Sequence, residues 1–143
     1  MTHDTVELLK ECNAGIKMAI SALDDVLPHI SETNLEKLIS DSREEHEELQ
    51  NEVYLLLTKL GESGKNPNPV AKMMEHMKTT FNLTFNEDDR TVSEIIDNGC
   101  RMGTDSIRKY LDKYAGAAPE AKEIAGKLIG IEERLSDKLE NYL

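Results

Sequence analysis

The sequence predicts an all-α fold, a four-helix bundle, from three observations. Apolar residues recur at alternating spacings of three and four along most of the chain, as on one face of an α-helix. No segment shows the sustained alternation of apolar and polar residues that marks a half-buried strand. Aromatic residues, which favour strands, make up only 4% of the chain, and tryptophan is absent. Aliphatic side chains must therefore fill the core.

The first two long helices are predicted over residues 4–29 and 33–60. Thr33 and Glu36 have the spacing of a capping box, in which each side chain accepts a hydrogen bond from the other residue's backbone N–H. Gly61 is the residue at which the second helix should stop. The inward positions of the two helices are expected to be Leu9, Cys12, Ile16, Ala19, Leu23 and Val26, then Leu35, Ile39, Ser42, His46, Leu49, Val53, Leu56 and Leu60.

Two further long helices are predicted over 90–114 and 119–143, with a short helix over 69–84 in the connection before them. Thr91 and Glu94 form a second capping box at the start of the third long helix. The short helix carries its apolar residues on one side: Val70, Met73, Met74, Met77 and Phe81. This side is expected to cover the bundle. Because methionine adapts to varied partners, a groove for a peptide or a protein is the alternative.

The lengths of the connections predict the topology. Short connections join the first pair of helices and the last pair, so each pair is expected to be an antiparallel hairpin. The connection over 61–89 is long enough to travel the length of the bundle before the third long helix begins. This connectivity is that of an up-down bundle with one crossover, and residues 1–143 are expected to form a single domain.

Four segments carry a family resemblance: NAGIKMAI in the first helix, EEHEELQNEVYLLLTKLG in the second, and GTDSIRKYLDKY and IEERLSDKLENYL in the last two. Together with the helix pattern, they resemble the ferritin-like four-helix-bundle proteins of unknown function, which are distant relatives of the rubrerythrins. The resemblance spans nearly the whole chain and implies a ferritin-like fold. It implies no particular activity, because the family itself has no settled function.

Dinuclear iron sites in ferritin-like folds use a Glu from each of two helices and a Glu-x-x-His motif from each of the other two. Residues at i and i+3 share one helical face, so such a motif can hold one pair of metal ions. In the first helix, Glu11 is predicted at the side or back, away from the inward positions. In the third long helix, Asp97 is predicted to point away from the core.

The other two helices also lack the complete motif. Arg43 stands three residues before the inward His46, where a Glu is needed. Leu135 stands three residues after Glu132, where a His is needed. We therefore expect that the dinuclear metal ligands are missing from this chain.

His46 and Glu132 are nevertheless both predicted near mid-height of the bundle, with Ala19 and Cys100 at a similar level. One interpretation is a reduced metal site, in which His46 and Glu132 hold a single iron, manganese or zinc ion. The other is a buried hydrogen bond between the two side chains. This bond would avoid the cost of about 1–3 kcal/mol for a buried polar group without a partner. The hydrogen bond is the more economical interpretation.

The chain has 17 basic and 28 acidic residues and a net charge of −11, which disfavours binding to nucleic acid or to anionic membranes. No apolar run approaches the roughly 18 residues of a membrane span, and the first residues lack the features of a signal peptide. Cys12 and Cys100 are predicted about 12 Å apart along the bundle axis, too far for a disulfide. A soluble, cytoplasmic protein with reduced thiols is expected.

Gly99 and Gly103 lie one turn apart on the inward side of the third long helix. Because a glycine inside a helix costs about 1 kcal/mol against alanine, they are expected to permit tight packing. A homodimer contact or a void for a ligand is the alternative. The sequence carries no phosphate-binding glycine loop and no recognisable nucleophile beside a His and an acid. We expect a non-catalytic bundle without a cofactor, which acts through association as a homo-oligomer and with a protein partner.

Overall fold

A computed structural model describes residues 2–62 and 88–143 of the chain. Its helices are α1 (Thr2–Val26), α2 (Thr33–Lys59), α4 (Asp89–Lys113) and α5 (Pro119–Leu139). A single turn of 3₁₀ helix follows α1 at Leu27–His29, and another follows α5 at Glu140–Tyr142. The described residues contain no strand, so the predicted all-α fold is confirmed. The short helix predicted over 69–84 lies outside the described residues.

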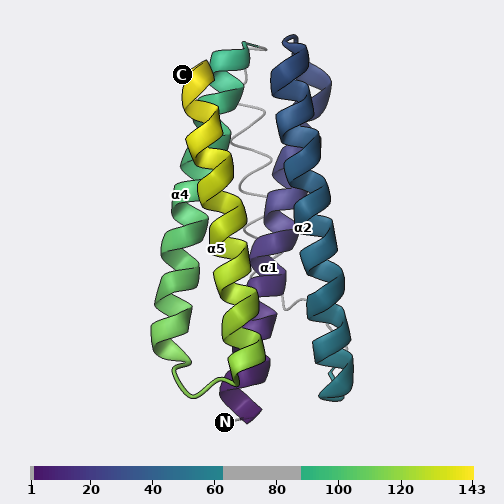
Figure 1. The fold of residues 1–143 in the computed structure, drawn as a ribbon, viewed down its shortest axis with the longest axis vertical. Coiled ribbons are helices and arrows are strands. Elements are labelled where there is room, and N and C mark those ends of the chain that lie inside the picture. The colour runs from purple at the N-terminus through teal and green to yellow at the C-terminus, as the bar shows by residue number, and fades with distance from the viewer. Residues whose placement is uncertain (1, 63–87) are drawn as a thin grey trace.

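The four helices form one elongated bundle (Figure 1). α1 packs against α2 and α4, and α5 packs against the same two helices. α1 and α5 also contact each other through the middle of the bundle, so α2 and α4 lie at opposite corners (Figure 1). The predicted four-helix bundle is therefore confirmed.

One carboxylate fixes the direction of α4 relative to α2. Asp89, the first residue of α4, accepts hydrogen bonds from the backbone N–H groups of Ser31 and Glu32, at 2.9 and 2.8 Å. Since Ser31 and Glu32 precede α2 directly, α2 and α4 begin at the same end and run in the same direction, as Figure 1 shows. The chain between the end of α2 and the start of α4 thus joins opposite ends of the bundle, which confirms the predicted crossover.

Two side chains near the start of α1 hold the turn between α4 and α5. The Asp4 carboxylate accepts from the N–H of Gly116 at 3.0 Å, and the Thr5 hydroxyl accepts from the N–H of Ala118 at 2.8 Å. Ala118 immediately precedes α5, so the Thr5 contact also places the first turn of that helix. These bonds close the end of the bundle opposite Asp89.

The second helix ends where the sequence predicted. Gly61 has a φ of 78°, in the left-handed region that glycine adopts without strain. The N–H of Gly61 donates to the carbonyl of Thr58 at 3.0 Å, and the N–H of Glu62 donates to the carbonyl of Leu57 at 2.9 Å. This pair of bonds is a Schellman motif, which satisfies carbonyls at the end of the helix.

Both predicted capping boxes are wrong, because an acidic residue further upstream caps each helix. The carboxylate of Glu32 accepts from the N–H of Asn34 at 3.3 Å, so Thr33 is already the first residue of α2. The carboxylate of Asp88 accepts from the N–H of Arg90 at 2.7 Å, and α4 begins at Asp89. A carboxylate suits this place because it also interacts favourably with the positive end of the helix dipole.

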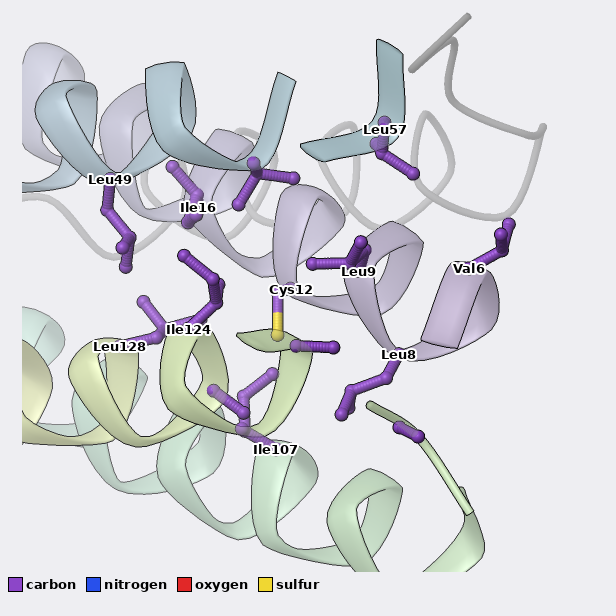
Figure 2. Packing of buried hydrophobic residues seen from close by; sticks show 14 of the residues in the cluster. Val6, Leu8, Leu9, Cys12, Ile16, Leu49, Leu57, Ile107, Ile124 and Leu128 are labelled. Carbon is purple, nitrogen blue, oxygen red and sulfur yellow. The ribbon is translucent and has the colours of Figure 1, made fainter. Parts of the chain in front are cut away.

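The buried apolar side chains form two clusters, one in each half of the bundle. Figure 2 shows side chains of α1, α4 and α5 meeting around Cys12 in the cluster nearer the α4–α5 turn. The other cluster lies nearer the α1–α2 turn and includes Leu23, Val26, Leu35, Ile39, Val92, Ile96, Leu135 and Leu139. Neither cluster contains His46 or Glu132, which lie at the level between them.

Candidate functional site

His46 of α2 and Glu132 of α5 meet in the interior of the bundle. His46 is 0% exposed, and its Nε2 lies 2.8 Å from Oε1 of the buried Glu132. The Nδ1 of the same ring lies 2.8 Å from the backbone carbonyl oxygen of Ser42, one turn earlier in α2. The sequence predicted the inward positions and the shared level of these two side chains, and the hydrogen bond between them is present.

This geometry favours a charged pair. The Ser42 carbonyl can only accept, so Nδ1 of His46 carries a proton and donates to it. The other ring nitrogen faces the Glu132 carboxylate, and a second proton there makes the ring an imidazolium. Burial lowers the pKa of His46, but the hydrogen bond and negative charge of Glu132, with the Ser42 carbonyl, outweigh it. The pKa of His46 is consequently raised above its ordinary 6.5.

Cys100 of α4 completes this buried cluster. Its thiol lies beside the Glu132 carboxylate, so side chains of α2, α4 and α5 meet at this point. Burial raises the pKa of the Cys100 thiol well above its usual range, and the negative charge of Glu132 acts in the same direction. Burial likewise raises the pKa of Cys12 to about 12. Both cysteines are free, as predicted, and both are protonated thiols rather than nucleophiles at neutral pH.

Asp97 does not point away from the protein, as the sequence analysis expected. It is only 7% exposed, accepts a hydrogen bond from the hydroxyl of Ser136 on α5, and accepts another from Nε of Arg101 at 3.0 Å. The prediction failed because α4 buries two adjoining faces, one towards the centre of the bundle and one against α5. Asp97 lies in the second interface, where the small Ser136 leaves room for a carboxylate.

Glu11 lies at the side of α1, one of the two places that the sequence analysis expected, and faces α4. The hydroxyl of Tyr110 on α4 lies beside the Glu11 carboxylate. Hydrogen bonding to this carboxylate, assisted by burial, raises the pKa of Tyr110 to about 12. Glu11 and Tyr110 therefore bridge α1 and α4 in the half of the bundle that holds the α4–α5 turn.

A cavity of about 400 Å³ lies between α1 and α4. Glu11 and Tyr110 line it, and His46, Cys100 and Glu132 are among its inner residues. Most of the remaining lining consists of small or apolar side chains, among them Ala14, Gly15, Met18, Ala19, Ala22, Ile95, Gly99, Met102, Gly103 and Ile107. Sequence reasoning did not predict that Glu11 and Tyr110 meet at this cavity.

The two glycines of α4 do not bring helices into tight contact. A Cβ atom at Gly99 would meet no atom within 4 Å, and at Gly103 the nearest would be Cδ of Glu132, at 3.9 Å. Both glycines line the cavity. The expected tight packing is therefore wrong, and the alternative, a void beside these residues, is the one that the structure shows.

No family model, no curated protein and no solved structure matches the chain. The ferritin-like relationship therefore stays a prediction. Within residues 2–62 and 88–143, no helix combines the length and apolarity needed to cross a bilayer.

The metal chemistry of the buried cluster depends on how its groups are already used. No group of three or more His, Cys, Asp or Glu side chains in the described part of the chain is arranged to hold a metal ion. Nε2 of His46, the nitrogen left over for a metal when Nδ1 is bonded to a backbone carbonyl, is bonded to Glu132 instead. A metal ion would have to replace the proton between these two side chains.

Proposed function

We propose that this chain is a non-catalytic, ferritin-like bundle of the cytoplasm that acts through protein association, as a homo-oligomer and with a protein partner. One observation supports the proposal above others. The polar side chains at mid-height partner one another, whereas the apolar surface between α1 and α4 stays open around a cavity.

The outer edge of this cavity supplies the apolar surface for association. Met102 of α4 is 70% exposed, although its neighbours in the lining are buried or half-buried apolar residues. Met18 of α1 and Ile95 of α4 are half-buried beside the same opening. Methionine adapts its shape to a partner, and a continuous apolar patch of this kind is typical of protein interaction sites.

Light scattering over a range of protein concentrations tests the proposal. We expect the wild type to be an oligomer and Met102→Lys to be a monomer, because a charge in an apolar contact has no partner there. Leu55→Lys is the matched control, since Leu55 of α2 is 66% exposed but does not line the cavity. A wild type that is a strict monomer at high concentration contradicts the proposal, as does equal dissociation by both substitutions.

The alternative function is binding of a single iron, manganese or zinc ion by His46 and Glu132. One observation favours it: the bond from Nδ1 of His46 to the Ser42 carbonyl is the support that metal-bound histidines generally have. The proposal of a non-catalytic role ranks higher because the carboxylate of Glu132 already serves His46 and Cys100.

A further inference from the structure

The cavity between α1 and α4 has the size of a small-molecule site. Its volume of about 400 Å³ falls within the range typical of ligand pockets, roughly 300–1,000 Å³. Along α1 its lining extends from Glu11 to Leu23, a length of about 18 Å at the rise of an α-helix. The space therefore suits an elongated molecule that lies along the helices.

The shape of the cavity depends on residues that leave out side-chain volume. Gly15 and Ala19 of α1 face the cavity together with Gly99 and Gly103 of α4. A side chain at Gly99 would enter open space. A glycine inside a helix costs about 1 kcal/mol against alanine, and close packing normally offsets that cost. Beside Gly99 and Gly103 there is open space instead of a closely packed neighbour. Contacts with a bound apolar molecule would offset the cost.

The charges around the cavity select the kind of molecule. Among the described residues, its lining includes the carboxylates of Glu11 and Glu132 but no Lys or Arg. The Glu132 carboxylate is hydrogen-bonded to the ring of His46, whereas the Glu11 carboxylate has the neutral hydroxyl of Tyr110 beside it. Apart from His46, whose ring is already hydrogen-bonded to Glu132, an anionic ligand would find no cationic side chain among the described lining residues. A cationic one would find the Glu11 carboxylate and, beyond it, a surface of net charge −11.

We propose that the cavity binds an elongated apolar amine in its cationic form. The apolar chain lies between α1 and α4 against Ala19, Gly99 and Gly103, and the ammonium group pairs with Glu11. The inference goes beyond the proposed association, because it uses the inner wall of the cavity rather than Met102 at its edge. Loss of association on Met102→Lys and loss of amine binding are accordingly separate observations.

Three probes with the same chain and different head groups test the charge selection. Dodecylammonium, dodecanol and dodecanoate are each titrated into the full chain by calorimetry, below the concentration at which the probe forms micelles. We expect one molecule of dodecylammonium per chain, weaker binding of dodecanol and no binding of dodecanoate. Glu11→Gln should bring the affinity for dodecylammonium down to that for dodecanol, a change of about threefold for a partly exposed charge pair.

A cavity-filling variant distinguishes the cavity from the acidic surface. Gly99→Leu places a side chain in the open space and should weaken dodecylammonium binding by at least about tenfold, because the chain and the leucine compete for one volume. Gly126→Leu is the matched control: Gly126 is a helical glycine of α5 that also has no atom within 4 Å of a Cβ, and it lies outside the cavity. Circular dichroism verifies that both variants are folded.

Three results would overturn the proposal. Binding of dodecanoate as tight as that of dodecylammonium removes the charge argument. Unchanged dodecylammonium binding in Gly99→Leu means adsorption to the acidic surface. Failure of the folded wild type to bind any of the three probes means that the cavity is not a site for an apolar amine.

Discussion

The imidazole of His46 is held between the Ser42 carbonyl and the Glu132 carboxylate, with Nε2 of His46 2.8 Å from Oε1 of Glu132. This contact joins α2 to α5 at the level where the two apolar clusters of the core meet. Apolar side chains repeat along both helices, so their contacts do little to prevent α2 from sliding along α5. A directional hydrogen bond at this level fixes the relative height of the two helices. A buried charge pair is a poor source of net stability, and we assign it this positioning role.

Removal of one partner of this pair should destabilise the protein more than removal of both. His46→Leu leaves the Glu132 carboxylate buried without its cation, which typically costs about 3–5 kcal/mol. His46→Leu combined with Glu132→Leu replaces the pair by apolar side chains and should recover most of that loss. Urea unfolding of the wild type, both single variants and the double variant measures the coupling. Additive losses in the double variant would show that the two side chains act independently.

Stability should depend on pH through the same histidine. The pKa of His46 is raised in the folded protein, so its contribution is fully present below the unfolded pKa of about 6.5. The contribution is lost as pH rises through the folded pKa. We therefore expect the free energy of unfolding of the wild type to decrease as pH rises from about 6.5 through the folded pKa of His46. The dependence should be flatter in Glu132→Gln. A ring titration followed by NMR gives the midpoint directly, and a wild-type midpoint at or below 6.5 would contradict the assigned charge pair.

Most inward positions could be predicted because each depends on one helix at a time. At the end of α2 the prediction was wrong: Leu60 is 40% exposed, and Leu57 is buried instead. A period of 3.6 residues places His46 and Glu132 on inward faces, and counting from the helix ends places them at one level. Asp97 could not be assigned in this way, since its burial depends on which residue of α5 lies opposite, and that residue is the small Ser136. The bond from Asp4 to Gly116 joins residues 112 positions apart, and no local pattern marks it.

The sequence predicted a void beside Gly99 and Gly103 only as an alternative, because a void depends on how two helices pack against each other. Gly99 and Gly103 show that side-chain volume is missing from one face of α4, but they do not show whether α1 moves in to fill it. The outcome depends on the separation of two helix axes, which the side chains of every neighbouring contact determine together. The bridge from Tyr110 to Glu11 is one such contact.

Metal analysis should distinguish the two proposed functions. We expect protein purified without an affinity tag to contain well below one ion of iron, manganese or zinc per chain, because Glu132 is already hydrogen-bonded to His46 and has the Cys100 thiol beside it. Elemental analysis of the wild type and of Glu132→Gln measures this. Stoichiometric metal in the wild type that is lost in Glu132→Gln would instead support the reduced metal site.

The contact between Asp4 and Gly116 should make two glycine substitutions differ in sign. A Cβ at Gly116 would lie 2.8 Å from Oδ2 of Asp4, the atom that accepts from the Gly116 N–H. Because Asp4 can rotate away, Gly116→Ala should cost little more than this hydrogen bond, about 1 kcal/mol. Gly126→Ala, on an exposed position of α5 with no atom within 4 Å, should instead stabilise by up to about 1 kcal/mol through helix propensity.

A double-mutant cycle attributes the effect at Gly116 to the contact itself. Asp4→Ala removes the carboxylate, so that Gly116→Ala has nothing left to displace, and the two substitutions together should cost no more than either alone. Chemical unfolding of the four proteins measures the coupling. If Gly116→Ala stabilises the wild type as Gly126→Ala does, or if the two losses add, the Asp4 carboxylate does not hold the turn between α4 and α5.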